Sequence, residues 1–174
     1  GSLAKGYFFF AIMVTVIMWF GQIITLIGVK EPKITKPQKH TSLKELLSVI
    51  VKNDQLLLTA IAMTLFMIGY ITTSFGLYFF KYAYGDESMY SVFAIILGLS
   101  QISALIIFPV LSKFFVRQKI YTASIIMVLA GYTIFFFAPT NTMLFIGISG
   151  VLIFVGQAFI QLMMLMFLAD CVDY

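Results

Sequence analysis

The amino-acid sequence predicts an all-α integral membrane protein with about five transmembrane helices. Of its 174 residues, 61% are hydrophobic and 10% are charged, whereas a soluble domain typically carries about 25% charged residues. Five apolar segments are long enough to cross a hydrocarbon core, which takes about 20 helical residues. The connections between them differ strongly in basic residues, as expected of a chain that crosses a membrane repeatedly.

The five spans are predicted at about 7–29, 55–80, 90–112, 119–138 and 142–168. Six lysines fall between the first and second spans. The connection between the third and fourth spans carries Lys113, Arg117 and Lys119. On the opposite side only Lys5 and Lys81 are basic. Because cytoplasmic loops are enriched in Lys and Arg, the two basic connections are predicted to be cytoplasmic.

The first connection is long and has its own pattern. Pro32 and Pro37 favour extended backbone in the residues that precede them. Ser42 and Glu45 have the spacing of a capping box. Apolar residues then follow at helical spacing, namely Leu43, Leu46, Leu47 and Ile50. We therefore expect a short amphipathic helix at the inner membrane surface.

Several functional classes are excluded or disfavoured by composition. The lone Cys171 excludes an internal disulfide and a multi-cysteine metal site. His40 lies among lysines and is interpreted as a solvated loop residue. The net charge of +4 follows membrane topology, so no nucleic-acid partner is predicted. A membrane enzyme would need convergent His, Asp or Glu, and apart from Asp170 and Asp173 the chain offers none, so no enzyme is predicted.

Charges of both signs are predicted at one membrane depth on the cytoplasmic side. Asp170 and Asp173 share a helical face at the end of the last span. Ionised groups at such a depth are usually paired and functional. Arg117 and Lys119 reach the same depth from the connection before the fourth span. Ion pairs between these groups are one interpretation, and solvated topology markers are the other.

Short motifs carry a family resemblance. The last six residues, Ala-Asp-Cys-Val-Asp-Tyr, and the Lys-Asn-Asp-Gln-Leu string at 52–56 both resemble signatures of the glycoside–pentoside–hexuronide:cation symporters. This family is the melibiose-permease-like branch of the major facilitator superfamily. A third match is the Tyr- and Phe-rich end of the second span, followed by Gly85 and Asp86. Physically, Asn53 and Asp54 also suit the start of a helix, where they cap it and face its positive dipole end.

The resemblance implies major facilitator-type transmembrane helices, present in part as the sixth to tenth helices of a parent carrier. On this basis residues 1–29 are the last helix of the amino-terminal half, and residues 30–54 are the cytoplasmic central loop. Residues 55–174 are then the first four helices of the carboxyl-terminal half. The implied function is symport of a glycoside, pentoside or hexuronide with H⁺ or Na⁺ by alternating access.

The resemblance also implies the surroundings of the chain. The expected partners are the lipid bilayer, a small sugar and the remainder of the transporter, in a bacterial cell membrane. No cofactor is expected, and the acids that bind the coupling cation are expected in the amino-terminal half. In this family the matching aspartates belong to a cytoplasmic charge network, so Asp170, Asp173, Arg117 and Lys119 are the candidate gating residues.

Polar residues within the spans are the candidates for substrate binding, because an amide or hydroxyl in lipid needs a hydrogen-bond partner. The candidates are Gln157, Gln161, Tyr70, Ser74 and Gln101. Gln157 and Gln161 are four residues apart, as are Tyr70 and Ser74, so each pair is predicted to share a helix face. A sugar offers many hydroxyls to such groups, and hydrogen bonds between helices are the alternative.

Three glycines of the last span are predicted to allow close helix packing rather than chemistry: Gly147, Gly150 and Gly156.

Two further alternatives to a sugar carrier remain open. One is a non-catalytic interaction subunit whose five helices are complete in themselves. The other is the same fold carrying a non-sugar solute. Continuation of the reading frame past Tyr174 into Gly-Glu and two more spans would favour a carrier over a subunit.

Overall fold

The computed structural model describes residues 3–29, 42, 48, 52–140 and 142–173. The chain divides into two units, Gly1–Thr41 and Ser42–Tyr174, and each is described by itself. The described residues form helices and turns without a strand. Five of these helices are long and apolar enough to cross a membrane: Ala4–Gly28, Asp54–Tyr84, Met89–Phe114, Arg117–Phe137 and Met143–Cys171. The predicted all-α membrane class and its five spans are therefore confirmed.

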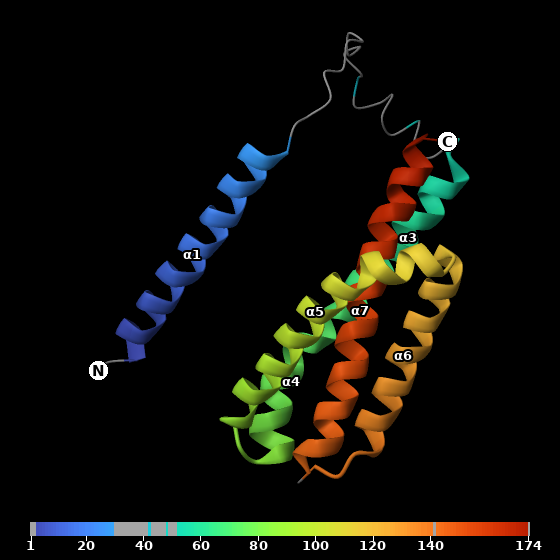
Figure 1. Ribbon diagram of the computed structural model, residues 1–174. Helices are drawn as coiled ribbons and strands as arrows, with labels where there is room; N and C mark the ends of the chain where they lie inside the picture. Colours follow the sequence, from blue (N-terminus) through green and yellow to red (C-terminus); the bar gives the residue numbers. More distant parts are fainter. Residues whose placement is uncertain (1–2, 30–41, 43–47, 49–51, 141, 174) are drawn as a thin grey trace. The chain divides into compact units, whose positions relative to one another are not determined.

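The first unit contains the helix α1, Leu3–Gly28 (Figure 1). Its side chains from residue 4 onward are exposed within their own unit. Thr15 and Thr25 donate their hydroxyls to carbonyls one turn earlier in the same helix, at 2.8 and 3.0 Å. An apolar helix that satisfies its own polar groups in this way suits direct contact with lipid.

The second span is one continuous but irregular helical rod. It begins as α3, Asp54–Ile71, and tightens into a 3₁₀ turn, η1, at Thr72–Phe75. The short α4, Gly76–Tyr78, leads into a π-helix, η2, at Phe79–Tyr84. The prediction that Tyr70 and Ser74 share a face assumed a regular α-helix. That assumption is wrong here, because a 3₁₀ turn has three residues per turn and shifts every later side chain around the axis.

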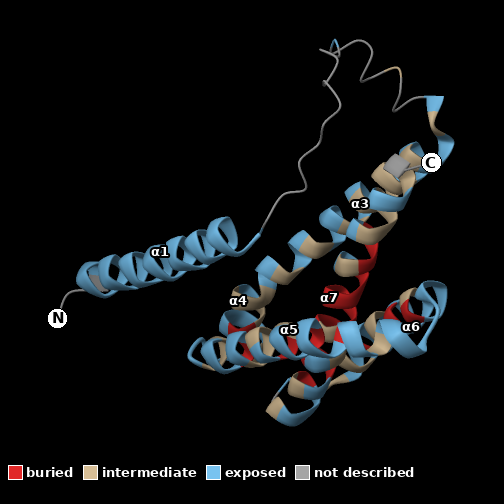
Figure 2. Cartoon of the chain, turned by 45° about the horizontal axis from the view of Figure 1, so that its top comes forward, coloured by how far each residue is buried: buried red, intermediate tan, exposed pale blue. Residues whose placement is uncertain are grey.

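Three further helices complete the second unit: α5, Met89–Phe114; α6, Arg117–Phe137; and α7, Met143–Asp173. The helix α7 contacts α5, α6 and α3, so it is the centre of this unit. Figure 2 shows the buried residues concentrated along α7. Within the most apolar part of each span, 44% of α7 is buried, against 17% of α5 and α6 and 0% of span two.

The contact between α6 and α7 depends on small residues that face each other reciprocally. A Cβ atom on Gly131 of α6 would lie 3.1 Å from the carbonyl oxygen of Ser149. A Cβ atom on Gly156 of α7 would lie 2.9 Å from the carbonyl oxygen of Ser124. On the other side of α7, Gly150 lies under the ring of Phe93 of α5. The predicted packing role of Gly150 and Gly156 is therefore confirmed, because only glycine permits these approaches.

Two apolar clusters fill the unit, one toward each end of the bundle. One cluster consists of Ala104, Phe108, Ile120, Ala158, Phe159 and Met163. The other consists of Phe80, Phe93, Ile146, Ile153 and Phe154. We name the two ends of the unit by a residue at each: the Arg117 end, with Asn53, Asp170 and Cys171, and the Gly85 end, with Asp86 and Met143. The Arg117 end is the one predicted to be cytoplasmic.

The turn at the Gly85 end reverses the chain between span two and α5. Gly85 has a φ of 85°, a left-handed conformation that favours glycine. The side-chain oxygen Oδ1 of Asp86 then accepts hydrogen bonds from the backbone N–H and the hydroxyl of Ser88, at 2.9 and 2.6 Å. Lys81 and Glu87 form an exposed ion pair at 3.6 Å. The capping box with Glu45, the amphipathic helix and His40 lie outside the described residues.

Candidate functional site

The start of span two is joined to the end of α7. Asn53 is the N-cap of α3, and its Oδ1 accepts a hydrogen bond from the backbone N–H of Leu56 at 3.0 Å. Its Nδ2 donates to the backbone carbonyl of Cys171 at 3.2 Å. The hydroxyl of Thr59 lies 3.6 Å from the Cys171 sulfur. The predicted cap at Asn53 is thus confirmed, and the same side chain also joins two helices, which the sequence did not indicate.

Asp170, the residue before Cys171 on α7, connects this helix to α6. The carboxylate of Asp170 accepts a hydrogen bond from the guanidinium of Arg117, which begins α6, and the two form an ion pair. Their side chains are 56% and 47% exposed. Consecutive residues of α7 therefore hold α6 through Asp170 and α3 through Cys171. The last turn of α7 is the point where three spans meet at the Arg117 end.

The other two predicted gating residues have different surroundings. Lys119 is exposed and, among the described residues, is in no ion pair. It borders an apolar groove between α5, α6 and α7, together with Phe115 and Phe159. The side chain of Asp173 lies outside the described part of the chain. Arg117 and Asp170 are thus the two predicted gating residues that the structure brings into contact.

The predicted substrate residues lie in three different environments. Tyr70 of α3 accepts a hydrogen bond from Gln101 of α5 at 3.3 Å, and both side chains are half-buried. Gln157 of α7 is only 4% exposed. Ser74 and Gln161 are exposed. The four-residue spacing of Gln157 and Gln161 therefore does not give them the same surroundings, because α6 covers the first and not the second.

A tyrosine outside the predicted set is the partner of Gln157. Tyr132 of α6 accepts a hydrogen bond from the Nε2 of Gln157 at 3.4 Å. The Tyr132 hydroxyl also lies 3.4 Å from the hydroxyl of Thr72 in η1. A tyrosine in the middle of a span carries a signal of its own, because its hydroxyl needs a partner there. That signal could have identified Tyr132.

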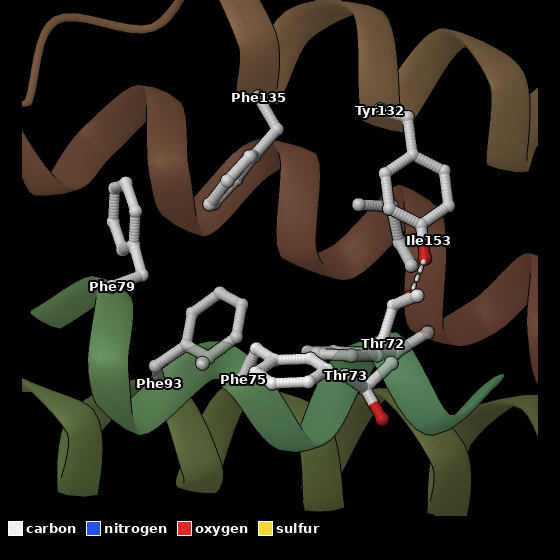
Figure 3. A pocket seen from close by; sticks show the side chains of 10 residues that line it. Thr72, Thr73, Phe75, Phe79, Phe93, Tyr132, Phe135 and Ile153 are labelled. Atoms are coloured by element: carbon white, nitrogen blue, oxygen red, sulfur yellow. Dashed lines mark hydrogen bonds between the residues drawn. The ribbon is translucent and has the colours of Figure 1, made fainter. Parts of the chain in front are cut away.

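Next to this contact lies a cleft of about 180 Å³ between span two, α5, α6 and α7 (Figure 3). Most of its walls are aromatic, from Phe75, Phe79, Phe93, Phe135 and Phe154. Thr72, Thr73 and Tyr132 contribute the polar groups. Pockets for small-molecule ligands are typically about 300–1,000 Å³. The volume of this cleft, as formed by the described part of the chain, lies below that range.

Comparison with known proteins gives the chain its family. A family model described as MFS/sugar transport protein matches residues 1–174. The lactose permease of Leuconostoc lactis is 28% identical over 98% of this chain and 27% of its own length. The lactose permease of Lactobacillus delbrueckii subsp. bulgaricus is 31% identical, and the raffinose carrier protein of Pediococcus pentosaceus is 30% identical, with the same coverage.

The chain spans about a quarter of the length of these curated relatives, with 27% covered. The family and these relatives are transporters rather than enzymes. The match extends over all five apolar spans, including α1. This chain of membrane-spanning helices belongs to the MFS/sugar transport protein family.

Proposed function

We propose that the chain is part of a secondary active sugar transporter that moves its substrate together with H⁺ or Na⁺ by alternating access. The observation that carries this proposal is the family match over the whole chain. The contacts at the Arg117 end and in mid-span support it, because they join separate helices through a few polar groups. Carriers of this general kind move by rocking or gating of helix groups around a central site.

The substrate class that we propose is an oligosaccharide glycoside. The relatives are named for lactose and raffinose, which are both oligosaccharides that contain a galactosyl group. We assign substrate binding to Tyr70, Ser74, Gln101, Gln157 and Gln161. Gln161 and Ser74 support the assignment because they are exposed polar side chains on apolar spans. Amide and hydroxyl groups can both donate to and accept from sugar hydroxyls.

The gating role is assigned to the charges at the Arg117 end. Arg117 and Asp170 are paired in the present conformation, and both are about half exposed to solvent. A half-exposed ion pair contributes little to stability, so it can break and reform at low cost during a conformational cycle. Lys119 and Asp173 are proposed as alternative partners for these two groups once the pair has opened.

The remaining parts of the proposal concern the whole carrier. No Asp or Glu occurs between Glu87 and Asp170 or between Asp54 and Asp86, so these spans offer no mid-membrane acid for a coupling cation. We place the cation site in the amino-terminal half of the transporter, as the family resemblance implies. Residues 1–29 are assigned to the last helix of that half, 30–54 to the central loop and 55–174 to the carboxyl-terminal half. The proposed location is the cytoplasmic membrane of a bacterium.

Uptake by the full-length protein in vesicles tests this function. Lactose, raffinose, a pentoside and a hexuronide are offered under an imposed H⁺ or Na⁺ gradient, with Asp170→Asn and Gln161→Ala alongside the wild type. We expect gradient-driven uptake of at least one galactoside and reduced uptake in both variants. Uptake of none of these sugars by folded protein would contradict the sugar assignment and favour a non-sugar solute. Uptake unchanged by either substitution would retain the carrier and reject these two residues.

A further inference from the structure

The two halves of span two are anchored very differently. The half toward the Arg117 end is α3, which contains no buried residue. The half toward the Gly85 end contains Phe80, which is fully buried. The ring of Phe80 packs 5.3 Å from Phe93, and the ring of Phe79 packs 4.8 Å from Phe135. One half is therefore fixed in an aromatic cluster, whereas the side chains of the other are at most half-buried, and polar contacts at Asn53 and Tyr70 join it to α7 and α5.

The backbone changes geometry where these halves meet. Thr72–Phe75 is a 3₁₀ turn, and Phe79–Tyr84 is a π-helix. Irregular segments of this kind inside a long helix often mark a hinge. Thr72 and Thr73 donate their hydroxyls to the carbonyls of Gly69 and Tyr70, at 2.6 and 2.7 Å. Such bonds from a side chain to the preceding turn compete with the helical ladder and bend helices.

A hydrogen-bond chain with a fixed direction reaches this bend from two other helices. A threonine hydroxyl has one proton, and Thr72 uses it on the carbonyl of Gly69. In the contact of Thr72 with Tyr132, the tyrosine must therefore be the donor. The Tyr132 oxygen in turn accepts from Gln157. The chain runs from the amide of α7 through α6 to the backbone of span two, and Figure 3 shows its link between Tyr132 and Thr72.

The first member of the hydrogen-bond chain, Gln157, is a buried amide with few partners. Gln157 is buried, and its Oε1 has no hydrogen-bond partner among the described residues. Among the described residues, the one hydrogen bond of the Gln157 side chain is the bond that its Nε2 donates to Tyr132. A buried amide with one partner loses all of its hydrogen bonding when that partner leaves. The Tyr132 hydroxyl oxygen lies 3.4 Å from both the Thr72 hydroxyl and the Gln157 Nε2, and these distances are long for hydrogen bonds. Tyr132 can therefore separate from both groups at low cost.

We propose that Thr72–Phe75 is a hinge of span two and that Tyr132 is the positioning residue that latches it to α6 and α7. With the latch made, α3 lies against α7. With the latch broken and the bond from Asn53 to the Cys171 carbonyl opened, α3 swings about η1 while the Phe80 half stays in its cluster. The hinge itself rests on the irregular backbone of span two and on its contacts with α6 and α7. Its consequence for transport rests on the proposed function.

Distances between spin labels in the full-length protein test the hinge without any transported sugar. One label replaces Leu58 on α3 and the other replaces Phe136 on α6, since both side chains are exposed, at 65% and 82%. Cys171 is changed to Ser in this background. We expect Tyr132→Phe and Thr72→Val each to raise the population of a second distance roughly fivefold, the effect of losing about one hydrogen bond.

Two matched substitutions serve as controls. Tyr121→Phe removes a hydroxyl from the same helix, at a ring that packs edge-on against Phe167. Thr64→Val removes a hydroxyl of α3 that bonds to the carbonyl of Ala60 in its own helix. Both controls are expected to keep the wild-type distance distribution. An unchanged distribution in both latch variants would overturn the hinge, and so would an equal change in the two controls.

Sugar uptake by the same variants gives the functional readout. If the hinge moves during transport, Tyr132→Phe should change kcat severalfold while KM stays close to the wild-type value. A change confined to KM would contradict the positioning role and make Tyr132 a substrate contact. If the wild type transports none of the sugars, the proposed function fails, and the label distances still decide whether the hinge exists.

Discussion

The pair α6–α7 and the helix α3 show two ways of holding a span in one bundle. Along α6 and α7, a glycine on each helix lies so close to the other helix that an added Cβ atom would be 2.9–3.1 Å from a backbone oxygen. Along α3 there is no buried residue, and a Cβ atom on Gly69 would meet nothing within 4 Å. The first arrangement relies on close backbone packing, whereas the second combines half-buried side chains with hydrogen bonds near its two ends.

The difference has a physical consequence in a membrane. Lipid chains are as apolar as leucine side chains, so burial of apolar surface gives helices little reason to associate. Close packing and polar contacts remain as the sources of stability. The pair α6–α7 uses the first over its whole length and should behave as a rigid scaffold. The helix α3 has side chains that are at most half-buried and adds polar contacts at Asn53 and near Thr72, so its position should be sensitive to changes of single side chains.

The largest effect is expected from adding one methyl group to the scaffold. In Gly156→Ala the new Cβ atom would lie 2.9 Å from the backbone oxygen of Ser124, which cannot move without shifting α6. Overpacking of this kind costs roughly 1–3 kcal/mol. Thermal unfolding of the purified full-length protein measures it. Gly69→Ala is the matched control on α3 and should leave the unfolding temperature unchanged or raise it slightly, because alanine favours helix. Equal losses in the two variants would contradict the distinction between scaffold and α3.

A smaller effect is expected at the polar attachment of α3. Asn53→Ala removes both the N-cap and the bond to the Cys171 carbonyl, and loss of a cap alone costs about 1 kcal/mol. Asn53→Asp keeps the acceptor for the cap but removes the Nδ2 donor. Comparing the two unfolding temperatures therefore separates the cap from the contact between helices. If Asn53→Asp were as stable as the wild type, the bond to α7 would contribute nothing to holding α3.

The ion pair between Arg117 and Asp170 should matter still less for stability. Both side chains are about half exposed, and exposed pairs contribute about 0–1 kcal/mol. A double-mutant cycle with Arg117→Gln and Asp170→Asn isolates the coupling energy, and Lys119→Gln is the control. We expect a coupling below about 1 kcal/mol that decreases with salt. A coupling of several kcal/mol would show that the pair fixes α6 to α7 rather than opening and closing as a gate.

The sequence was sufficient to predict the transmembrane spans, because a span is marked by the length and hydropathy of its own residues. Length and hydropathy predicted the helices at Met89–Phe114 and Arg117–Phe137 to within two residues at either end. The cap at Asn53 was also predictable, because a cap depends on a side chain and the three residues after it. Gly150 and Gly156 of α7 were recognised as packing residues, although Gly131 on α6 was not, and Gly147 makes only an ordinary contact with Ile96.

The arrangement of polar groups was less predictable because it depends on which helices meet. Spacing placed Gln157 and Gln161 on one face, but the burial of Gln157 is due to α6, whose position no local pattern gives. Tyr132 was overlooked because the residues one helical turn before it, Val128 and Leu129, are apolar, so no polar residue one turn away marks a face. At Thr72–Phe75 the expected regular helix was wrong, and there the hydroxyls of Thr72 and Thr73 bond to carbonyls of the preceding turn.

The smallest expected effect is at the Gly85 end, where the anchored half of span two turns into α5. The pKa of Asp86 lies below its ordinary value of 3.8, because the side chain and the backbone N–H of Ser88 donate hydrogen bonds to the carboxylate. Because the pKa of Asp86 is lower in the folded state, the contribution of its ionised carboxylate to stability is complete at a pH above the unfolded-state pKa. It is lost as the pH falls through the lower folded value.

Asp86→Ala should therefore lower the unfolding temperature slightly near neutral pH, and its difference from the wild type should shrink as the pH falls below 3.8. Glu87→Gln serves as the control, since it removes the neighbouring charge that pairs with Lys81 and leaves the Asp86 turn intact. A difference for Asp86→Ala that stayed constant across this range would mean that the loop does not depend on the ionised carboxylate. The anchoring of the Phe80 half would then come from its aromatic packing alone, which would sharpen the contrast with α3.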